Sequence, residues 1–581
     1  MNSKAIILSA LVLACVAASA QNFNPSVEVT NAYEGKPVDA RKQDLAMNIP
    51  DSLLVFDYDF DYSVFDNPYK GSYEFSPYLI NMKPEPVPYA GRNFYLRAGA
   101  GYSLHPELAL MYSPTATGKW KLDVYDGFQG YLGSYRRIKG FEFSAREGYL
   151  VDNYDKSTFS GHDLENNFGL NLRGDFRRSV LTANVNYKLL TVADTMVTHL
   201  YNEASARVHY ALKPGQRAGL TLEGVAEGKI GGDNMTYMRS GYALSNKEVN
   251  ARVLAGVEVM PNTRFLVEAG TEVGIYSRII VTSVLDVWGT PKLAWSYGPV
   301  SASAGVKFAH IFAWDPHTRS LVQQHQKKSA LFYPDAHLNI RILKQGLTLY
   351  ADVTGGNDIN TFSSLLSKNH FFNQVYQLSY CWAPTMDNSV TRYKGTAGLR
   401  GQVAGAVQYN LYASYAYVEN NLLEGLFKTN RATVNPVPLA AAFCYQDMKM
   451  LTAGADLLWK SDRLSAAGRF QYLKADYMGS GYVTSNDINY VPLPEFTAEG
   501  NITYNWAERL YVRVSADFAS ERNGYFVIPM YCDLGVQAEF RFDRRTSFWA
   551  KGGNLLNQTI QKSLTRAENG MYFTAGICLN F

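Results

Sequence analysis

The sequence predicts an all-β fold, a transmembrane antiparallel β-barrel of about 22 strands, with roughly 20 to 24 as the permitted range. Three observations lead to this prediction. Apolar and polar residues alternate from about residue 93 to the end, tight turns alternate with long loops, and only 18% of the residues are charged. Globular chains carry roughly 25% charged residues. The net charge of +3 gives no general attraction for nucleic acid, so we expect no nucleic-acid partner.

The first element is a predicted secretory signal peptide over residues 1–20. Lys4 supplies the positive charge, residues 5–18 are apolar, and Ala-Ser-Ala at 18–20 forms a small-residue cleavage site. Val12-Leu-Ala-Cys15 offers an alternative, because it loosely resembles a lipoprotein acylation site, but its second residue fits poorly. We therefore expect cleavage after residue 20 and export from the cytoplasm of a bacterium-like cell.

Residues 21–92 form the second predicted element, an extended segment rich in Pro, Asp and Tyr. Three aspartates at alternate positions from Asp57 have the spacing of a calcium loop. That site is not predicted, because Tyr62 stands where the loop needs Gly and Pro68 where it needs Glu. We hypothesise that the segment enters or caps a barrel lumen from the periplasmic side. The alternative is a periplasmic tail that binds a partner.

Residues 93–581 form the predicted barrel. In Leu181–Leu189, Leu510–Phe518 and Asp533–Phe542, one face of the strand is apolar and the other is mostly polar. Lipid solvates neither charges nor unpaired backbone groups, so we assign the apolar face to lipid and the polar face to the lumen. The lumen-facing candidates, whose charges are of both signs, are Arg173, Asp175, Lys188, Glu499, Asn501, Arg513, Asp517, Asp533, Glu539 and Arg541.

A soluble β-sandwich would show the same alternation, but three features argue against it. The strands are often roughly 10 to 16 residues long, whereas strands in globular proteins average about 5 to 6. Aromatic residues gather toward strand ends, as at Tyr415, Trp506 and Trp549, which is typical of the aromatic girdles of membrane barrels. Tight turns such as 213–215, 461–462 and 543–544 alternate with long loops, which we place at 315–330, 356–388, 420–445 and 476–490.

The last strand alternates as far as the terminal residue. One face holds Met571, Phe573, Ala575, Ile577, Leu579 and Phe581. This pattern resembles the C-terminal signal of bacterial outer-membrane barrels. The resemblance implies an outer-membrane location, a lipid-facing surface and recognition by the barrel-assembly machinery through Phe573, Ile577, Leu579 and Phe581.

Two short segments indicate a family. The last hairpin contains Trp549-Ala-Lys-Gly-Gly-Asn-Leu-Leu-Asn557, and an earlier segment runs Leu349-Tyr-Ala-Asp-Val-Thr-Gly-Gly-Asn-Asp-Ile-Asn-Thr-Phe362. Both resemble the barrels of TonB-dependent receptors, and the resemblance covers residues 93–581. Such receptors carry a plug of roughly 150 residues ahead of the barrel, whereas residues 21–92 are too few for one. The resemblance therefore implies a receptor-like barrel without a full plug, and we do not expect a full energised transporter driven by TonB.

No enzymatic chemistry is predicted. Gly-x-Ser-x-Gly, His-Glu-x-x-His and phosphate-loop motifs are absent from the sequence, and Asp315-Pro-His317 is the one candidate we name for a lipase-like site. The mature chain would hold four cysteines without metal-binding spacing (Cys381, Cys444, Cys532 and Cys578), so we expect free thiols with at most one bridge, and no cofactor or metal.

The sequence thus predicts passage or uptake of a nutrient or small solute across the bacterial outer membrane. We expect the binding determinants in loops 356–388 and 420–445, because recognition concentrates on loops. The alternative is a structural role, in which the barrel anchors an envelope complex through residues 21–92.

Overall fold

The computed structural model describes residues 93–581 except for 115–117, 137–140, 145–147, 152–157, 195–196, 214–219, 238–239, 279–281, 315–331, 344–345, 374–386, 404–405, 428–441, 479–487, 525–526 and 564–565. The predictions for the signal peptide, residues 21–92, Asp315–His317 and Cys381 therefore lie outside the described residues. The three cysteines within them, Cys444, Cys532 and Cys578, are free thiols.

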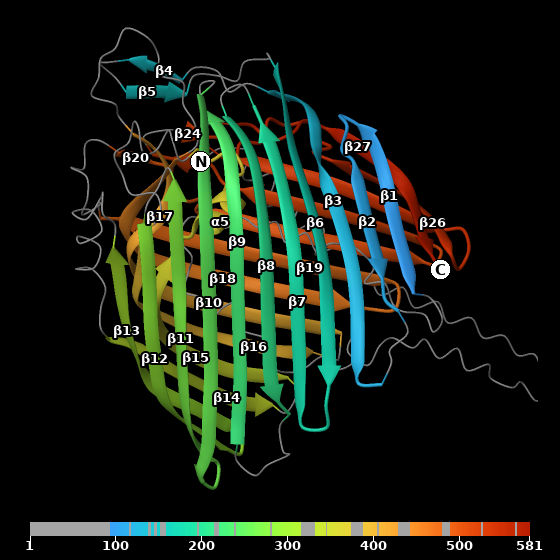
Figure 1. Cartoon of the computed structure of the whole chain (residues 1–581). Coiled ribbons are helices and arrows are strands. Elements are labelled where there is room, and N and C mark those ends of the chain that lie inside the picture. The colour runs from blue at the N-terminus through green and yellow to red at the C-terminus, as the bar shows by residue number, and fades with distance from the viewer. Residues whose placement is uncertain are drawn as a thin grey trace, which may run out of the picture. The chain divides into compact units, whose positions relative to one another are not determined.

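Twenty-two antiparallel strands form a closed barrel (Figure 1). Each strand pairs with the next along the chain, and the first pairs with the last, so the barrel has no free edge. The predicted fold class and strand number are confirmed. The barrel strands are β1 (Phe94–Tyr102), β2 (Glu107–Tyr112), β3 (Trp120–Arg136), β6 (Thr158–Asp175), β7 (Ser179–Ala193), β8 (Val197–Leu212), β9 (Leu220–Tyr237), β10 (Ser240–Met260), β11 (Thr263–Arg278), β12 (Thr282–Tyr297), β13 (Val300–Trp314), β14 (Phe332–Leu343), β15 (Leu347–Ile359), β16 (Asn388–Val403), β17 (Val407–Phe427), β18 (Ala442–Lys460), β19 (Leu464–Tyr477), β21 (Phe496–Trp506), β22 (Leu510–Ala519), β25 (Tyr531–Arg541), β26 (Thr546–Gly553) and β27 (Tyr572–Asn580).

The remaining elements lie in the connections. β20 (Ile488–Tyr490) pairs with the end of β17. Two small hairpins have no strand partners in the barrel sheet. One pairs β4 (Phe141–Ser144) with β5 (Gly148–Val151), and the other pairs β23 (Arg522–Asn523) with β24 (Val527–Ile528). Among the described residues, a short helix, α5 (Phe362–Lys368), follows β15. No helix among the described residues is both long and apolar enough to cross a bilayer.

The outer face of the barrel is apolar. On β7, Val185, Tyr187 and Leu189 are exposed, and Phe540 and Phe542 are exposed on and beside β25. These residues are the apolar members of the alternating segments. Exposed apolar side chains are also found on the other strands around the barrel. A closed barrel satisfies its backbone hydrogen bonds internally, and an apolar outer face suits lipid rather than water. The architecture is that of a protein of the bacterial outer membrane.

The two ends of the barrel differ in their connections. At one end, ten connections hold two to seven residues each, such as residues 261–262 between β10 and β11. At the other end, the connections reach the 28 residues of 360–387 between β15 and β16. Short turns mark the periplasmic end of bacterial barrels, so we assign the first end to the periplasm. Both termini of the barrel lie there, since the backbone amide of Asn93 donates to the carbonyl of Phe581.

The bounds predicted for the long loop 420–445 are wrong. β17 continues to Phe427 and β18 begins at Ala442, so only 428–441 separates them. The alternation fails in these outer strand ends because consecutive residues, including Leu422 and Leu423, are buried in an apolar cluster. A strand that is buried on both faces loses its period of two, and the sequence pattern therefore resembled a loop.

Trp549 does not belong to an aromatic girdle, contrary to the prediction. Its side chain is 2% exposed and lies inside the barrel, where the Arg97 guanidinium stacks on the indole at 3.9 Å. The indole covers two glycines that face each other across the seam between β1 and β27, Gly99 and Gly576. A Cβ atom on Gly99 would lie 2.6 Å from the carbonyl oxygen of Ala575, so the close seam requires glycine there.

We expect Gly99→Leu to destabilise the closure of the barrel. The larger side chain collides with Trp549, and overpacking of this kind costs about 1–3 kcal/mol. The measurement is the temperature at which the folded band of the purified protein converts to the unfolded band on a gel. The control is Ala98→Leu, on the opposite face of the same strand. An unchanged midpoint for Gly99→Leu would contradict the role of the seam glycines.

Candidate functional site

The connection between β15 and β16 folds into the lumen instead of extending away from the barrel. Its described part, residues 360–373, contains α5. The helix begins because the Thr361 hydroxyl accepts a hydrogen bond from the backbone amide of Ser364, and it ends after Lys368. We call residues 360–373 the inner loop.

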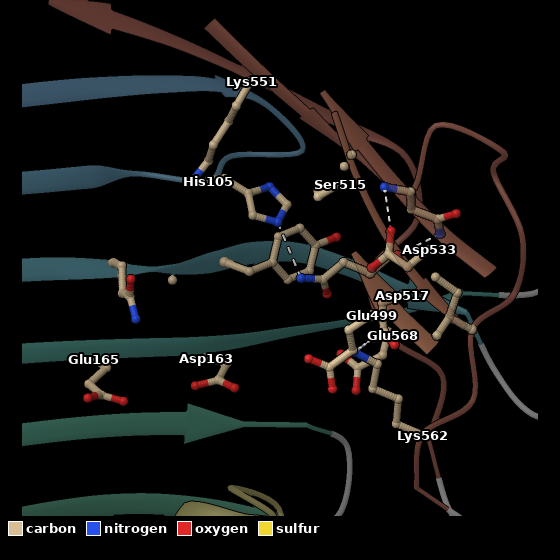
Figure 2. A pocket seen from close by; sticks show the side chains of 18 of the residues that line it. His105, Asp163, Glu165, Glu499, Ser515, Asp517, Asp533, Lys551, Lys562 and Glu568 are labelled. Atoms are coloured by element: carbon tan, nitrogen blue, oxygen red, sulfur yellow. Dashed lines mark hydrogen bonds and ion pairs between the residues drawn. The ribbon is translucent and has the colours of Figure 1, made fainter. Parts of the chain in front are cut away.

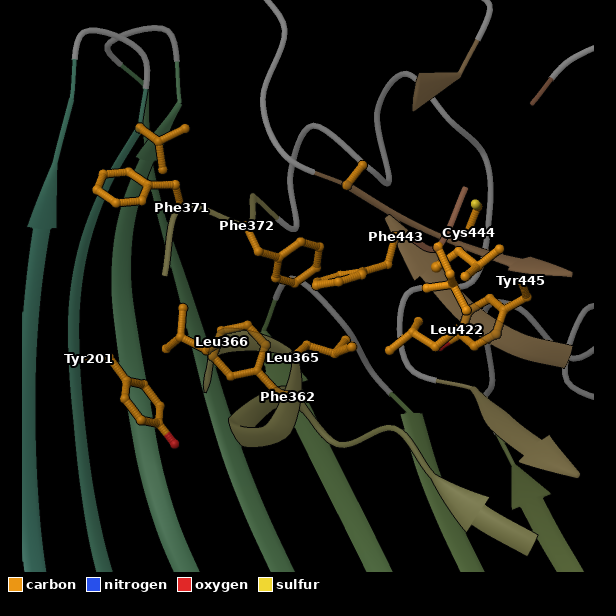
Figure 3. Close-up of a cluster of buried hydrophobic side chains, with 14 of the residues drawn as sticks. Tyr201, Phe362, Leu365, Leu366, Phe371, Phe372, Leu422, Phe443, Cys444 and Tyr445 are labelled. Carbon is orange, nitrogen blue, oxygen red and sulfur yellow. The ribbon is translucent and has the colours of Figure 1, made fainter. Parts of the chain in front are cut away.

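An apolar cluster holds the inner loop in the lumen (Figure 3). Phe362, Leu365 and Leu366 on α5 are almost completely buried, and Phe371 and Phe372 follow them. They contact side chains from two groups of strands. The partners on β7 to β11 are Leu190, Val192, Val197, Tyr201, Met235, Leu244 and Tyr276, and those on β17 to β19 include Val418, Leu422, Leu423, Phe443, Met448, Met450 and Leu473. This part of the lumen is therefore filled with apolar side chains.

Polar contacts fix both ends of the helix to the barrel wall. At its start, one carboxylate oxygen of Glu248 on β10 accepts from the backbone amide of Ser363 at 3.1 Å, and the other accepts from the Ser363 hydroxyl. Past its end, Asn369 donates to Glu424 on β17, and His370 contacts Asp163 on β6 at 2.9 Å. Because β6, β10 and β17 lie at separate positions around the barrel, the inner loop crosses the lumen from wall to wall.

The contact between His370 and Asp163 depends on pH. Burial disfavours the charged imidazolium, but the hydrogen bond and charge of Asp163 outweigh it and raise the pKa of His370. Lys188 opposes this charge and Glu165 supports it. The ion pair is therefore complete below the ordinary histidine pKa of about 6.5 and is lost as the pH rises through the raised value.

We expect the inner loop to loosen at alkaline pH. In single-channel recordings, the wild-type protein should show larger current fluctuations at about pH 9 than at about pH 6, because neutral His370 loses its charge attraction to Asp163. His370→Gln should fluctuate similarly at both values. If this variant kept the wild-type response to pH, His370 would not be the titrating group.

Beside the inner loop, a cavity of about 1510 Å³ remains open (Figure 2). It reaches from Leu458, near the periplasmic end of β18, to Ser563 and Arg566 in the connection between β26 and β27. Asp163 and Glu165 face it from β6, with charged groups from β21, β22 and β25 on the other side. The charged side chains that line it are Arg97, Glu107, Asp126, Asp163, Glu165, Lys368, His370, Glu424, Asp456, Arg469, Glu499, Arg513, Asp517, Arg522, Asp533, Lys551, Lys562, Arg566 and Glu568, with His105 beside them.

Residues from the connection between β26 and β27 line the cavity at the end away from the periplasm. Lys562 lies 3.2 Å from a carboxylate oxygen of Asp517. Burial disfavours the charge of Lys562, but the carboxylates of Asp517, Glu568 and Asp533 raise its pKa. The guanidinium of Arg566 lies between the rings of Tyr135 and Phe371, 3.6 Å and 3.1 Å from their centroids. The second contact ties this connection to the inner loop.

The ten candidates from the sequence fall into three groups. Glu499, Asn501, Arg513, Asp517 and Asp533 line the cavity together. Lys188 and Glu539 do not line the cavity themselves. Lys188 lies 3.4 Å from Glu165, which is one of the lining residues. Glu539 is buried and accepts a hydrogen bond from the Ser547 hydroxyl at 2.8 Å. Arg173, Asp175 and Arg541 lie at the periplasmic ends of their strands, away from the cavity. At the C-terminus, Phe573 and Phe581 are exposed, and Ile577 and Leu579 alternate with buried Cys578.

Sequence reasoning missed the groups that hold the inner loop. Glu248 and Glu424 look like ordinary polar members of long strands, and α5 is seven residues long with two serines at its start. No sequence signal indicates that a polar residue of one strand will bind the backbone of a loop 115 positions away. Among the described residues, no group of three or more His, Cys, Asp or Glu side chains could hold a metal ion.

The fold is similar to that of outer-membrane transporters of known structure. The copper transporter OprC is 10% identical over 84% of this chain and 80% of its own, with a TM-score of 0.58. The FrpB iron transporter from Neisseria meningitidis is 9% identical over 84% and 81%, with a TM-score of 0.59. The siderophore receptor PiuA from Acinetobacter baumannii is 8% identical over 84% and 82%, with a TM-score of 0.56. No protein-family model and no curated protein sequence matches the chain.

Proposed function

We propose, from the premise that this chain has the barrel fold of TonB-dependent receptors, that it passes a small polar solute across the bacterial outer membrane. The observation that carries the proposal is the cavity of about 1510 Å³, which lies inside the barrel and is lined by charges of both signs. A wall of this kind stays hydrated and replaces the water shell of a polar solute. The named transport roles of OprC and FrpB support the general class of activity.

We propose further that passage does not depend on a complete plug domain coupled to TonB. The support is the inner loop, a segment of the barrel itself that already fills part of the lumen. Residues 21–92 lie outside the described residues, and their role as a cap or as a partner-binding tail stays a prediction. The barrel is also proposed to be non-enzymatic.

The experiment is a planar-bilayer recording of the full mature chain. We expect discrete conductance steps from the folded protein and none from a sample that was heat-denatured before reconstitution. Solute selectivity is then measured by swelling of proteoliposomes in amino acids and sugars of similar size. Absence of both conductance and swelling, combined with co-purification of a stable periplasmic protein, would overturn the transport proposal and favour the anchoring role.

The C-terminal strand is proposed to be the part that the barrel-assembly machinery recognises. Phe581 is exposed, and its carbonyl accepts from the backbone amides of Asn93 and Phe94 at the seam. We expect Phe581→Asp to reduce the amount of folded protein in the outer membrane. The control, Asn580→Asp, adds the same charge one position earlier on the other face of the strand. Equal amounts of folded protein for both variants and the wild type would contradict the proposal.

A further inference from the structure

We infer that the periplasmic mouth of the lumen selects for anions, so that the solute is a small molecule bearing carboxylate or phosphate groups. The inference rests on the proposed function and narrows its substrate class. It comes from an excess of basic residues at one end of the barrel, a feature separate from the mixed charges of the cavity. We call the six residues that carry it, Lys121, Arg173, Arg264, Arg341, Lys460 and Arg541, the basic ring.

Charge is distributed unevenly between the two ends. Among the described side chains, each end of the barrel comprises its connections and the three strand residues that flank each connection on either side. The periplasmic end holds fourteen Lys and Arg against six Asp and Glu. The opposite end holds seven Lys and Arg against ten Asp and Glu. An anion that approaches from the cavity therefore meets an increasingly positive environment toward the periplasm.

The alternation of the strands directs the basic ring toward the lumen. Trp120 and Leu122 are exposed on the apolar outer face of β3, so Lys121 between them points inward. Phe540 and Phe542 place Arg541 inward in the same way. Arg341 shares its face with Asn339, to which Arg400 donates a hydrogen bond inside the barrel.

The remaining three members follow the same rule on their own strands. Arg173 alternates with the exposed Phe168 and Leu170, Arg264 precedes the exposed Phe265, and Lys460 follows the exposed Trp459. The six residues belong to six strands, β3, β6, β11, β14, β18 and β25, and are therefore distributed around the mouth.

Four members of the basic ring are not held in ion pairs with described residues, although Asp175 lies close enough to Lys121 and Arg173 to interact with their charges. Within the described part of the chain, no ion pair involves Lys121, Arg173, Arg264 or Arg341. Lys121 and Arg173 are directly opposite each other in the register of β3 and β6, an arrangement of like charges that is unfavourable for stability. The nearby Asp175 forms its ion pair with Lys213. A repulsive pair at a pore mouth is consistent with a role in attracting anions.

Rings of basic side chains raise the local concentration of anions and lower that of cations. We therefore expect the full mature chain to pass chloride in preference to potassium by about threefold in a planar bilayer with a KCl gradient. Because the effect acts through solvent, it should weaken as the ionic strength rises. Glutamate should also enter proteoliposomes faster than lysine, a cation of similar size.

The decisive variant is Lys121→Glu/Arg264→Glu/Arg341→Glu, which should reverse the preference to potassium. The matched control, Lys247→Glu/Lys449→Glu/Lys474→Glu, makes the same change in charge on residues that share a face with exposed apolar side chains. It should keep the wild-type preference. Folding of both is checked by the shift of the folded band on a gel.

The outcomes separate the two proposals. The wild-type protein could conduct ions but prefer potassium, or show no preference between potassium and chloride. Either result would overturn the inference of anion selectivity and leave the proposed transport function standing. An unchanged preference in the folded ring variant would also overturn the inference. If the wild-type protein does not conduct at all and transports neither amino acid, the proposed function itself fails.

Discussion

Deletion of residues 361–372 is expected to raise the single-channel conductance about threefold, because it removes the segment that crosses the lumen. An empty barrel of 22 strands encloses a wide channel, whereas the apolar cluster around Phe362 and Leu365 excludes water and ions from part of it. The barrel itself should survive the deletion, since its strands pair with each other and not with α5.

The measurement compares the conductance of the deletion with that of the wild type at the same salt concentration. A deletion of residues 141–151 is the matched control, because it removes a similar number of residues from a hairpin that pairs only with itself. The control should keep the wild-type conductance. An inner-loop deletion that folds and conducts no more than the wild type would show that the inner loop does not limit passage.

A second large effect is expected from Leu365→Asp. Leu365 is completely buried among apolar side chains, and a carboxylate placed there without a partner costs at least about 3 kcal/mol. The helix can relieve this cost by leaving the lumen while the strands stay paired. Because about 1.4 kcal/mol corresponds to a factor of ten, exposure of the inner loop should increase on the order of 100-fold.

Trypsin cleavage after Lys368 measures this exposure. The Leu365→Asp protein should be cut there rapidly, with the barrel remaining folded on the gel, whereas the wild type should be resistant. Ser367→Asp is the control, because it adds the same charge to the exposed side of α5. Equal cleavage of the two variants would mean that added charge, and not the loss of apolar packing, releases the loop.

The outer surface could be predicted from the sequence because lipid imposes a simple rule. Wherever a strand has lipid on one side and water on the other, its residues alternate, as in β7 and β22, and the register then follows from the pattern. The strand number followed in the same way, because every tight turn separates two alternating segments.

The lumen could not be predicted by this rule. Where the inner loop packs on the wall, residues such as Leu422 and Phe443 are apolar although they are inside the barrel, and the alternation disappears. Trp549 was misplaced for a related reason: an aromatic residue near a strand end has the same sequence signal whether it faces lipid or covers a glycine inside. Contacts such as Glu248 with Ser363 depend on the closed barrel and have no local signature.

The proposed path is tested most directly by thiol modification of two neighbouring residues on β22. Ser515 lines the cavity, whereas Val514 is exposed on the outer face. In a protein whose native cysteines are replaced by serine, a charged thiol reagent should reduce the current through Ser515→Cys and leave that through Val514→Cys unchanged. Block at Val514→Cys with no effect at Ser515→Cys would contradict the account, because ions would then not pass through this lumen.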